Sequence, residues 1–257
     1  MAKPMRLLTI ADGFGDSQAV PAWYPHYIKW PEIIRLMTRG VELHNLSRYG
    51  AGNEYIVQSL RNNLIDKDRV LVQWAIPNRL DLVLSHNQEY TEYWNDQIKN
   101  DPVYNDNVVA LGNQRVWITS ASTSPGVQEY HKKFIGRQQH QMRSQLFVDY
   151  ATLLLKHTQH GFLLTKTSEY LSETIKDTTN WYNKFQGMCE FRHQSKYAEL
   201  ELGLVQPTPL VQFDFIRQFV QPRFDLPWRS ERDINAVESM LYRKYQEAIK
   251  NKPHDTH

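Results

Sequence analysis

The amino-acid sequence predicts an α/β domain in which helices pack on both faces of a parallel β-sheet. Residues 6–11 and 69–74 form short, nearly continuous apolar runs, and residues 41–46 alternate between apolar and polar side chains. Such runs are typical of strands. Two segments with apolar side chains at helical spacing separate them, so the first 75 residues alternate strand, helix, strand, helix, strand. Parallel strands require crossover connections of this kind, which are usually helices.

Local signals indicate where the two crossover helices begin and end. The first helix is expected over residues 30–39, because Pro31 suits the first turn of a helix and Gly40 suits its end. The second is expected to begin at Asn53, a good N-cap residue, and to continue through the apolar positions of residues 56–64. Both helices therefore fit the short connections of a compact α/β unit.

Two more elements are expected in the middle of the chain. Residues 129–157 have the pattern of a long helix, with Leu146, Ala151, Leu153 and Leu154 on its buried side. Residues 161–165 then form another short apolar run between polar segments. We interpret this run as a further buried strand of the same sheet.

The chain is expected to form one domain over residues 1–250. Residues 85–115 are rich in aromatic, Asn and Asp side chains without clear periodicity, which indicates an insertion. Ser230 or Asp233 can cap a final helix that continues to about residue 249. Residues 251–257 are polar and are expected to form a flexible tail.

The composition excludes several functional classes. The 257-residue chain carries a formal net charge of only +2, so no strong electrostatic attraction to nucleic acid or to an anionic membrane is expected. No apolar stretch approaches the roughly 18 residues of a membrane span. Cys189 is the only cysteine, so no intrachain disulfide can form, and the apolar run at residues 7–11 is too short for a secretory signal. These features favour a cytoplasmic location.

Three polar loops follow the first three expected strands. They carry Gly15-Asp16-Ser17, then Gly50 in Asn45-Leu-Ser-Arg-Tyr-Gly50, and then Asn78 in Ala75-Ile-Pro-Asn78. In open parallel sheets, sites lie beyond the carboxyl ends of the strands. A serine nucleophile, a glycine that permits close approach of a ligand to the backbone, and an asparagine side-chain donor are groups that acyl transfer requires.

With these three blocks in this order, the chain resembles the SGNH, or GDSL-like, hydrolase superfamily. The resemblance implies a three-layer α/β/α sandwich of the flavodoxin-like kind. It implies that Ser17 is the nucleophile, and that Gly50 and Asn78 join the Ser17 backbone amide in the oxyanion hole. An Asp-x-x-His block before the last helix supplies the acid and the base in that family, and Asp225 occupies the position of the acid.

The chain is also similar to SGNH-like proteins encoded by tailed bacteriophages. That similarity rests on short runs at residues 30–32, 45–47, 52–56 and 73–74. It implies that the protein functions in a phage particle, where other virion proteins are its partners. A virion is then the alternative to a cytoplasmic location.

The sequence departs from the family pattern at two positions. Ile76 stands where the third block usually has glycine, and Trp228 stands where the family has the catalytic histidine. An indole N–H only donates hydrogen bonds, so Trp228 cannot accept the serine proton. Loss of the histidine from a serine triad can lower turnover by roughly 10⁶-fold. An efficient esterase with this sequence therefore needs another base.

Other histidines and carboxylates offer no clear replacement. His26 and His44 lie close in sequence to the first two loops, and His193 lies in a segment without an assigned element. The ordinary interpretation of each is a surface or core histidine. Asp12 and Asp16 are near Ser17, but a carboxylate is a poor base for a serine hydroxyl at neutral pH.

The remaining patterns predict neither a metal nor a cofactor. His157 and His160 have a spacing found in metal sites, with His140 upstream, but no second ligand cluster accompanies them. No phosphate-binding loop or dinucleotide fingerprint is present. The aromatic side chains of the insertion, among them Tyr90 and Trp94, suit either sugar stacking or a subunit interface.

Two functional hypotheses follow. The first is a serine ester hydrolase, such as a carbohydrate O-deacetylase, that acts on an acylated carbohydrate or another ester through Ser17, Gly50, Asn78 and Asp225 without a cofactor. The second is a catalytically silent SGNH-fold protein with a binding or structural role, for example as a homo-oligomer or with virion proteins. Trp228 and the aromatic insertion motivate the second hypothesis.

Overall fold

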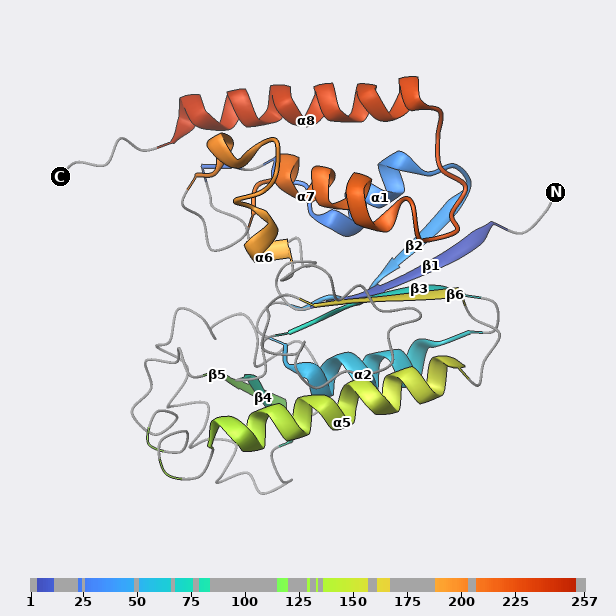
Figure 1. The fold of residues 1–257 in the computed structure, drawn as a ribbon, viewed down its shortest axis with the longest axis vertical. Coiled ribbons are helices and arrows are strands. Elements are labelled where there is room, and N and C mark those ends of the chain that lie inside the picture. Colours follow the sequence, from blue (N-terminus) through green and yellow to red (C-terminus); the bar gives the residue numbers. More distant parts are fainter. Residues whose placement is uncertain are drawn as a thin grey trace.

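The structure is a computed structural model of the whole chain. It describes residues 4–11, 23–24, 26–48, 51–65, 68–75, 79–83, 115–119, 129, 133, 136–156, 161–166, 188–202 and 207–252. Within these residues the protein has a mixed α/β fold around a four-stranded parallel sheet (Figure 1). The predicted α/β class is confirmed at this level.

The sheet consists of β1 (Met5–Ile10), β2 (Val41–Asn45), β3 (Arg69–Trp74) and β6 (Gly161–Lys166). The strand order is β2-β1-β3-β6, and each neighbouring pair is parallel. The chain thus moves outward from β1 to β2 and then crosses back to place β3 on the other side of β1. The point where the direction reverses, between β1 and β3, is where open α/β sheets place their ligands.

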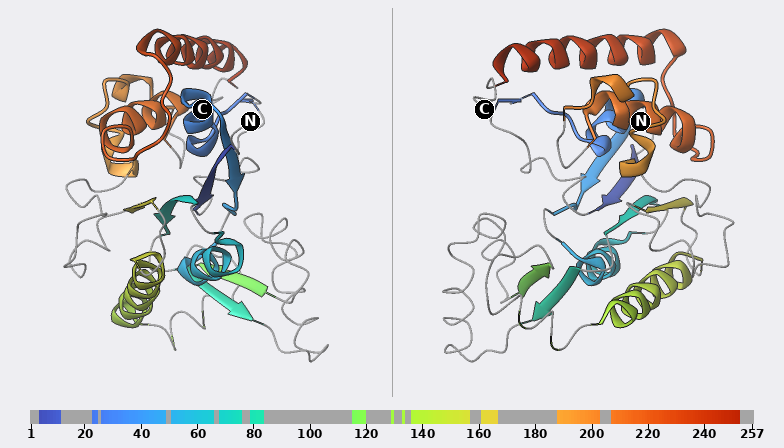
Figure 2. Two further views of the ribbon diagram at one scale, coloured as in Figure 1. Left: turned by 90° about the vertical axis from the view of Figure 1, so that its right-hand side faces the viewer. Right: turned by 60° about the vertical axis from the view of Figure 1, so that its left-hand side comes forward.

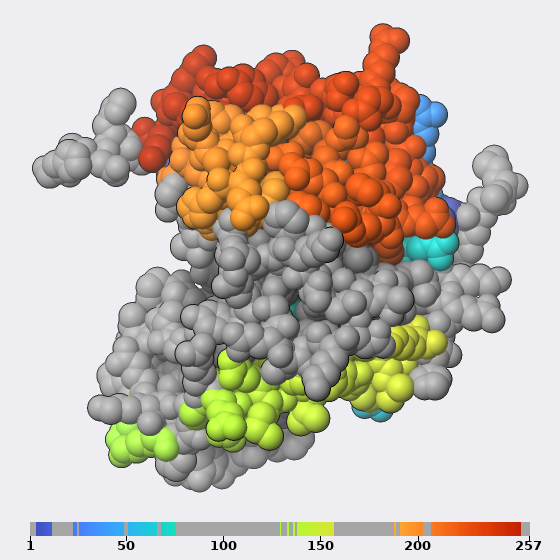
Figure 3. All heavy atoms as spheres, viewed as in Figure 1, coloured from blue at the N-terminus to red at the C-terminus, as the bar shows by residue number. Residues whose placement is uncertain are grey.

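Helices lie on both sides of this sheet. Helices α1 (Trp30–Met37), α7 (Pro209–Phe215) and α8 (Glu231–Asn251) are on one side, and α2 (Asn53–Asn63) and α5 (Arg137–Lys156) are on the other (Figures 1 and 2). In the space-filling view, α7 and α8 form one continuous flank of the molecule, and α5 lies on the opposite flank (Figure 3).

The alternation of side chains along the strands divides the core between the two faces. Leu7 and Leu71 belong to a buried cluster with side chains of α1, α7 and α8. Leu8 and Val70 alternate with them and are also completely buried. β1 and β3 are covered on both faces, which explains why their sequences are almost continuously apolar.

An antiparallel ribbon extends the fold beyond β3. Strand β4 (Arg79–Val83) pairs with β5 (Arg115–Thr119), so that Arg79 is opposite Thr119 and Val83 is opposite Arg115. The predicted insertion at residues 85–115 falls between these strands and lies almost entirely outside the described residues. The ribbon that flanks it was not predicted from the sequence.

The C-terminal part adds short helical elements beside α7. These are α6 (Met188–Phe191), the short helix η2 (Ala198–Leu200) and η3 (Ile216–Val220), which continues α7. The rings of Phe191, Phe215 and Phe219 pack against one another with centroids 5.1–5.6 Å apart. This aromatic contact fastens α6 to α7 and η3.

The helices predicted over residues 30–39 and 53–64 and before residue 249 are confirmed to within two residues, whereas α5 begins at Arg137 and not at residue 129. Ser230 caps α8, since its Oγ accepts a hydrogen bond from the Asp233 amide. By contrast, α2 is capped by Gly52, and Asn53 is the first residue inside the helix. On α5, Ala151 is buried as expected, but Leu146 and Leu153 were also expected to be buried and are 66% and 56% exposed. The α8 helix also extends through the first residue of the predicted tail. Among the described residues, no helix combines the length and apolar character needed to cross a membrane.

Candidate functional site

The chain segments that follow β1 and β2 stay together beyond the strands. The Leu46 amide donates a hydrogen bond to the Thr9 carbonyl at 2.8 Å, and the Arg48 amide donates to the Ala11 carbonyl at 3.1 Å. Ala11 is completely buried. The segment that leads toward Gly50 is therefore held against the segment that leads toward Ser17.

Asn53 fastens the start of α2 to the end of β3. Its Oδ1 accepts a hydrogen bond from the Ala75 amide at 2.8 Å, and its Nδ2 donates to the Ala75 carbonyl at 3.2 Å. The same Nδ2 lies 3.1 Å from Ser144 Oγ on α5. Because Asn53 is 3% exposed, these bonds form away from solvent. The side-chain amide thus satisfies both backbone groups of Ala75 as a neighbouring strand would.

These contacts bring the described flanks of the three predicted loops to one edge of the sheet. Ser17 follows Ala11 by six positions, Gly50 lies between Arg48 and Ala51, and Asn78 follows Ala75 by three positions. Ser17, Gly50 and Asn78 themselves lie outside the described residues, so their roles stay predictions. The edge at which their loops begin is the carboxyl edge, beside the switch point between β1 and β3.

The face of the sheet that packs against α1 carries polar side chains near its carboxyl edge. Thr9 is completely buried and its Oγ1 lies 3.1 Å from Asn45 Oδ1, which also accepts from the Ser47 amide at 3.1 Å. Gln73, one residue before the end of β3, is 1% exposed. Among the residues that the structure describes, neither Nε2 nor Oε1 of Gln73 has a hydrogen-bond partner. Gln73 was not predicted as a site residue, although a polar residue within the apolar run 69–74 was an available signal.

Asp225 lies at the opposite edge of the sheet from these loops. Its carboxylate is 3.3 Å from the guanidinium of Arg69, the first residue of β3, and its side chain is 92% exposed. β3 is six residues long, and at about 3.3 Å per residue its two ends are about 17 Å apart. This position argues against the predicted triad role, because a triad acid must contact the base beside the nucleophile.

Trp228 is held at the same amino-terminal edge. Its indole Nε1 donates to the Phe224 carbonyl at 3.1 Å, and its backbone forms a bridge with Thr38, which precedes β2. The Arg229 amide donates to the Met37 carbonyl at 2.8 Å, so this loop closes the end of α1. Trp228 therefore has a structural role at the edge remote from the three loops.

Four of the ten histidines fall within the described residues. His26, His44 and His193 are exposed, whereas His140 is 7% exposed. His140 lies one helical turn before Ser144 on α5, and therefore on the same face of that helix. Ser144 is hydrogen-bonded to the Asn53 side chain, which in turn contacts the residue after β3. His140 is therefore the described buried histidine, and contacts through Ser144 and Asn53 connect its helix face to the end of β3.

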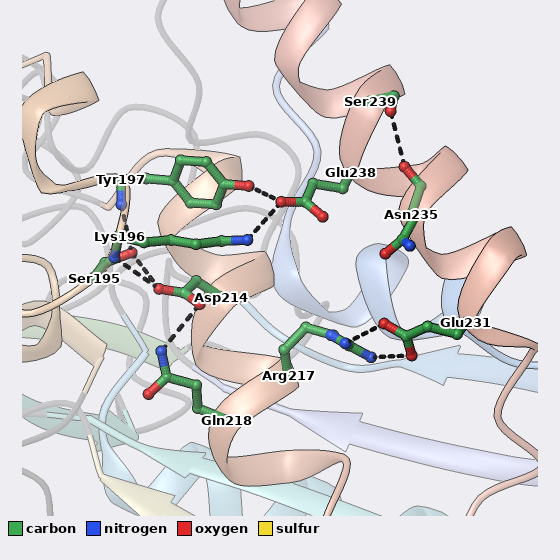
Figure 4. Close-up of polar contacts among 10 residues, drawn as sticks. All are labelled: Ser195, Lys196, Tyr197, Asp214, Arg217, Gln218, Glu231, Asn235, Glu238 and Ser239. Carbon is green, nitrogen blue, oxygen red and sulfur yellow. Dashed lines mark hydrogen bonds and ion pairs between the residues drawn. The ribbon is translucent and has the colours of Figure 1, made fainter.

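A second polar cluster lies among α7, α8 and the segment after α6 (Figure 4). Asp214 is 4% exposed and accepts hydrogen bonds from Ser195 Oγ at 2.6 Å, the Lys196 amide at 3.1 Å and Gln218 Nε2 at 3.0 Å. Ser195 Oγ in turn accepts from the Tyr197 amide at 3.1 Å. With every polar atom of this serine engaged by the protein, the cluster is a structural clip.

Glu238 on α8 completes the clip. It lies 2.6 Å from Lys196 Nζ and accepts a hydrogen bond from the Tyr197 hydroxyl. Burial alone would raise the pKa of the Glu238 carboxyl, but hydrogen bonds from Lys196 and Tyr197 outweigh it and lower this pKa. Burial and the bond to Glu238 raise the pKa of the Tyr197 phenol. The carboxylate and the neutral phenol are therefore the stable forms at neutral pH.

No group of three or more His, Cys, Asp or Glu side chains within the described part of the chain could hold a metal ion. His157 and His160, which have a metal-site spacing, lie outside that part. A scan against protein-family models matches no family. A search of curated proteins also finds no match.

Proposed function

We propose that this protein is an SGNH-type serine ester hydrolase with its site at the carboxyl edge of β1 and β3. The observation that carries the proposal is the joining of the loop flanks: Arg48 to Ala11, and Asn53 to Ala75. The strand order β2-β1-β3 with a further strand beyond β3 agrees with the flavodoxin-like, three-layer arrangement that the sequence resemblance implies.

In the proposed reaction, Ser17 Oγ attacks the carbonyl carbon of an ester such as an acetylated carbohydrate. The serine proton passes to a base and then to the departing alcohol oxygen, and water releases the acyl group from the serine in a second step. The backbone N–H groups of Ser17 and Gly50, with the Asn78 side chain, would stabilise the negative charge on the carbonyl oxygen. Asp225 has no part in this scheme, because it lies beside the opposite end of β3.

Because position 228 is a tryptophan, the base must be a histidine from elsewhere in the chain. His140 is buried, and His86 and His131 lie in the chain between β4 and α5 outside the described residues. Each of these histidines is replaced by Gln in turn. The base is the histidine whose replacement lowers turnover by a factor of roughly 10³ or more. Replacement of the exposed His193 is the matched control.

The test of the proposal is covalent labelling with a fluorophosphonate, followed by turnover of p-nitrophenyl acetate. The expected result is labelling of the wild-type protein and its loss in Ser17→Ala. Ser239→Ala, at an exposed serine of α8, should be labelled as the wild type is. A folded wild-type protein that reacts with neither reagent would contradict the proposal.

A second candidate function is supported by the position of Asp225 and Trp228. The two residues that align with the family's acid and base lie at the amino edge, joined to Arg69 and Thr38. A chain with this arrangement and no substitute base would be a catalytically silent binding or structural protein, as the phage resemblance also suggests. Sedimentation and binding measurements on an unlabelled, folded protein would then define its role.

A further inference from the structure

Gln73 is the one side chain of the described residues in which two buried polar atoms both lack a hydrogen-bond partner. It is 1% exposed, and the atoms are the donor Nε2 and the acceptor Oε1. Burial of an amide without a partner costs roughly 1–3 kcal/mol in proteins. Such a group in a native structure needs an explanation, for example a role in catalysis or a bound water or ion that the folded chain alone does not provide.

Gln73 stands at the end of β3 that borders the switch point. Ile10 of β1 pairs with Val72 of β3, so the next residues, Ala11 and Gln73, are neighbours at the carboxyl edge. Gln73 is on the same face as Leu71, which packs toward α1 and α7. The Arg48 amide donates a hydrogen bond to the Ala11 carbonyl, so the segment after β2 also lies at this edge.

We infer that Gln73 binds the alcohol part of the ester and selects a hydroxylated alcohol, as in a carbohydrate ester. This inference rests on the proposed hydrolase function. A primary amide offers one donor and one acceptor direction together, which neighbouring sugar hydroxyls satisfy because each hydroxyl both donates and accepts. An apolar alcohol would leave both atoms of Gln73 unpaired in the complex, so the site discriminates against it.

The variant that tests this role is Gln73→Met, which keeps the length of the side chain and removes both polar atoms. If a ligand is the partner of Gln73, the free variant should melt at the wild-type temperature or a few degrees above it, since an unpaired buried amide has been replaced by an apolar group. At the same time, kcat/KM for a partially O-acetylated xylo-oligosaccharide should fall by about ten- to a hundredfold. Turnover of p-nitrophenyl acetate should change less than about twofold, because its alcohol has no hydroxyl to pair.

Three outcomes would overturn the inference. A lowered melting temperature would show that Gln73 has a partner within the folded protein, such as a buried water. An equal fall in kcat/KM for both esters would indicate a general disturbance of the site. No change for either ester would mean that the amide does not meet the substrate. Gln246→Met, at an exposed position of α8, controls for the substitution itself.

Binding separates this inference from the proposed function. Calorimetry with the same oligosaccharide is performed on Ser17→Ala and on the double variant with Gln73→Met. If the wild-type protein hydrolyses neither ester, the proposed function fails, but binding that weakens about ten- to a hundredfold in the double variant still supports the role of Gln73. Equal binding by both variants, or binding by neither, overturns it.

Discussion

Replacement of Asn53 by alanine tests the joint that holds α2 to the end of β3. The change removes three hydrogen bonds, two to the Ala75 backbone and one to Ser144 Oγ. At about 1 kcal/mol for each bond, less about 0.5 kcal/mol for the better helix propensity of alanine, the free energy of unfolding should fall by about 2–3 kcal/mol. For a chain of this size, that loss lowers the melting temperature by about 4–12 °C.

The measurement is a urea titration with a parallel thermal melt. Asn62→Ala is the matched control, because Asn62 is exposed on the same helix, and it should change stability by no more than about 0.5 kcal/mol. Combining Asn53→Ala with Ser144→Ala should give a coupling energy of about 0.5–1.5 kcal/mol, since the two side chains are bonded. If Asn53→Ala costs no more than the Asn62 control, the joint does not stabilise this edge and the reasoning is refuted.

Three further predictions concern the amino edge and the clip beneath α8. Asp225→Asn should leave fluorophosphonate labelling within about twofold of wild type, because the carboxylate is remote from the carboxyl edge; a large loss would restore its triad role. Glu238→Gln should lower the free energy of unfolding at pH 7, and the difference from wild type should shrink as the pH falls below 4.5. The pKa of Glu238 is lowered in the folded protein, so its carboxylate stabilises the fold only while it is ionised. Thermal melts at both pH values test this prediction. Asp214→Ala should cost about 2–4 kcal/mol in urea titrations, because it removes the acceptor of the buried Ser195 hydroxyl, and a loss below 1 kcal/mol would contradict the clip.

The elements that the sequence predicted well are those with a local cause. β1, β3 and β6 are short apolar runs, and each pairs in the parallel sheet that the alternation implied. The start of α8 was also local, since Ser230 bonds to an amide three residues away. The β4–β5 ribbon was missed because its two strands are 31 residues apart between their facing ends, so no hairpin turn signals their pairing.

The predicted buried side of α5 was right for Ala151 and wrong for Leu146 and Leu153. The side that α5 turns inward carries His140, Ser144, Val148, Ala151 and Leu155. Small side chains on the inner face allow a close approach to α2, as the bond between Ser144 and Asn53 shows. Hydrophobicity alone did not identify this face, because the buried face includes the polar residues His140 and Ser144.

The candidate site shows the same division between local and non-local information. The three loops could be placed at one edge from the sequence, because each follows a strand of a parallel sheet. The hydrogen bonds between Asn53 and Ala75 could not be predicted from the sequence. An asparagine at the start of a helix is ordinarily interpreted as its N-cap, and here Gly52 has that position. Gln73 gave a local signal, a polar residue in a buried strand, but only the fold showed that its amide is unpartnered.

The displacement of Asp225 changes what the fold can imply about activity. Spacing before the last helix suggested a triad acid, but the order of residues along the chain does not fix the edge at which a helix begins. α8 begins beside the amino ends of β2 and β3, because Arg229 bonds to Met37 and Asp225 to Arg69. β3 is about 17 Å long, so a carboxylate bonded to its first residue is remote from the carboxyl end of the strand and would not orient a base there. Activity therefore depends on whether a histidine from elsewhere in the chain reaches the carboxyl edge, which makes the histidine replacements more decisive than any change at Asp225 or Trp228.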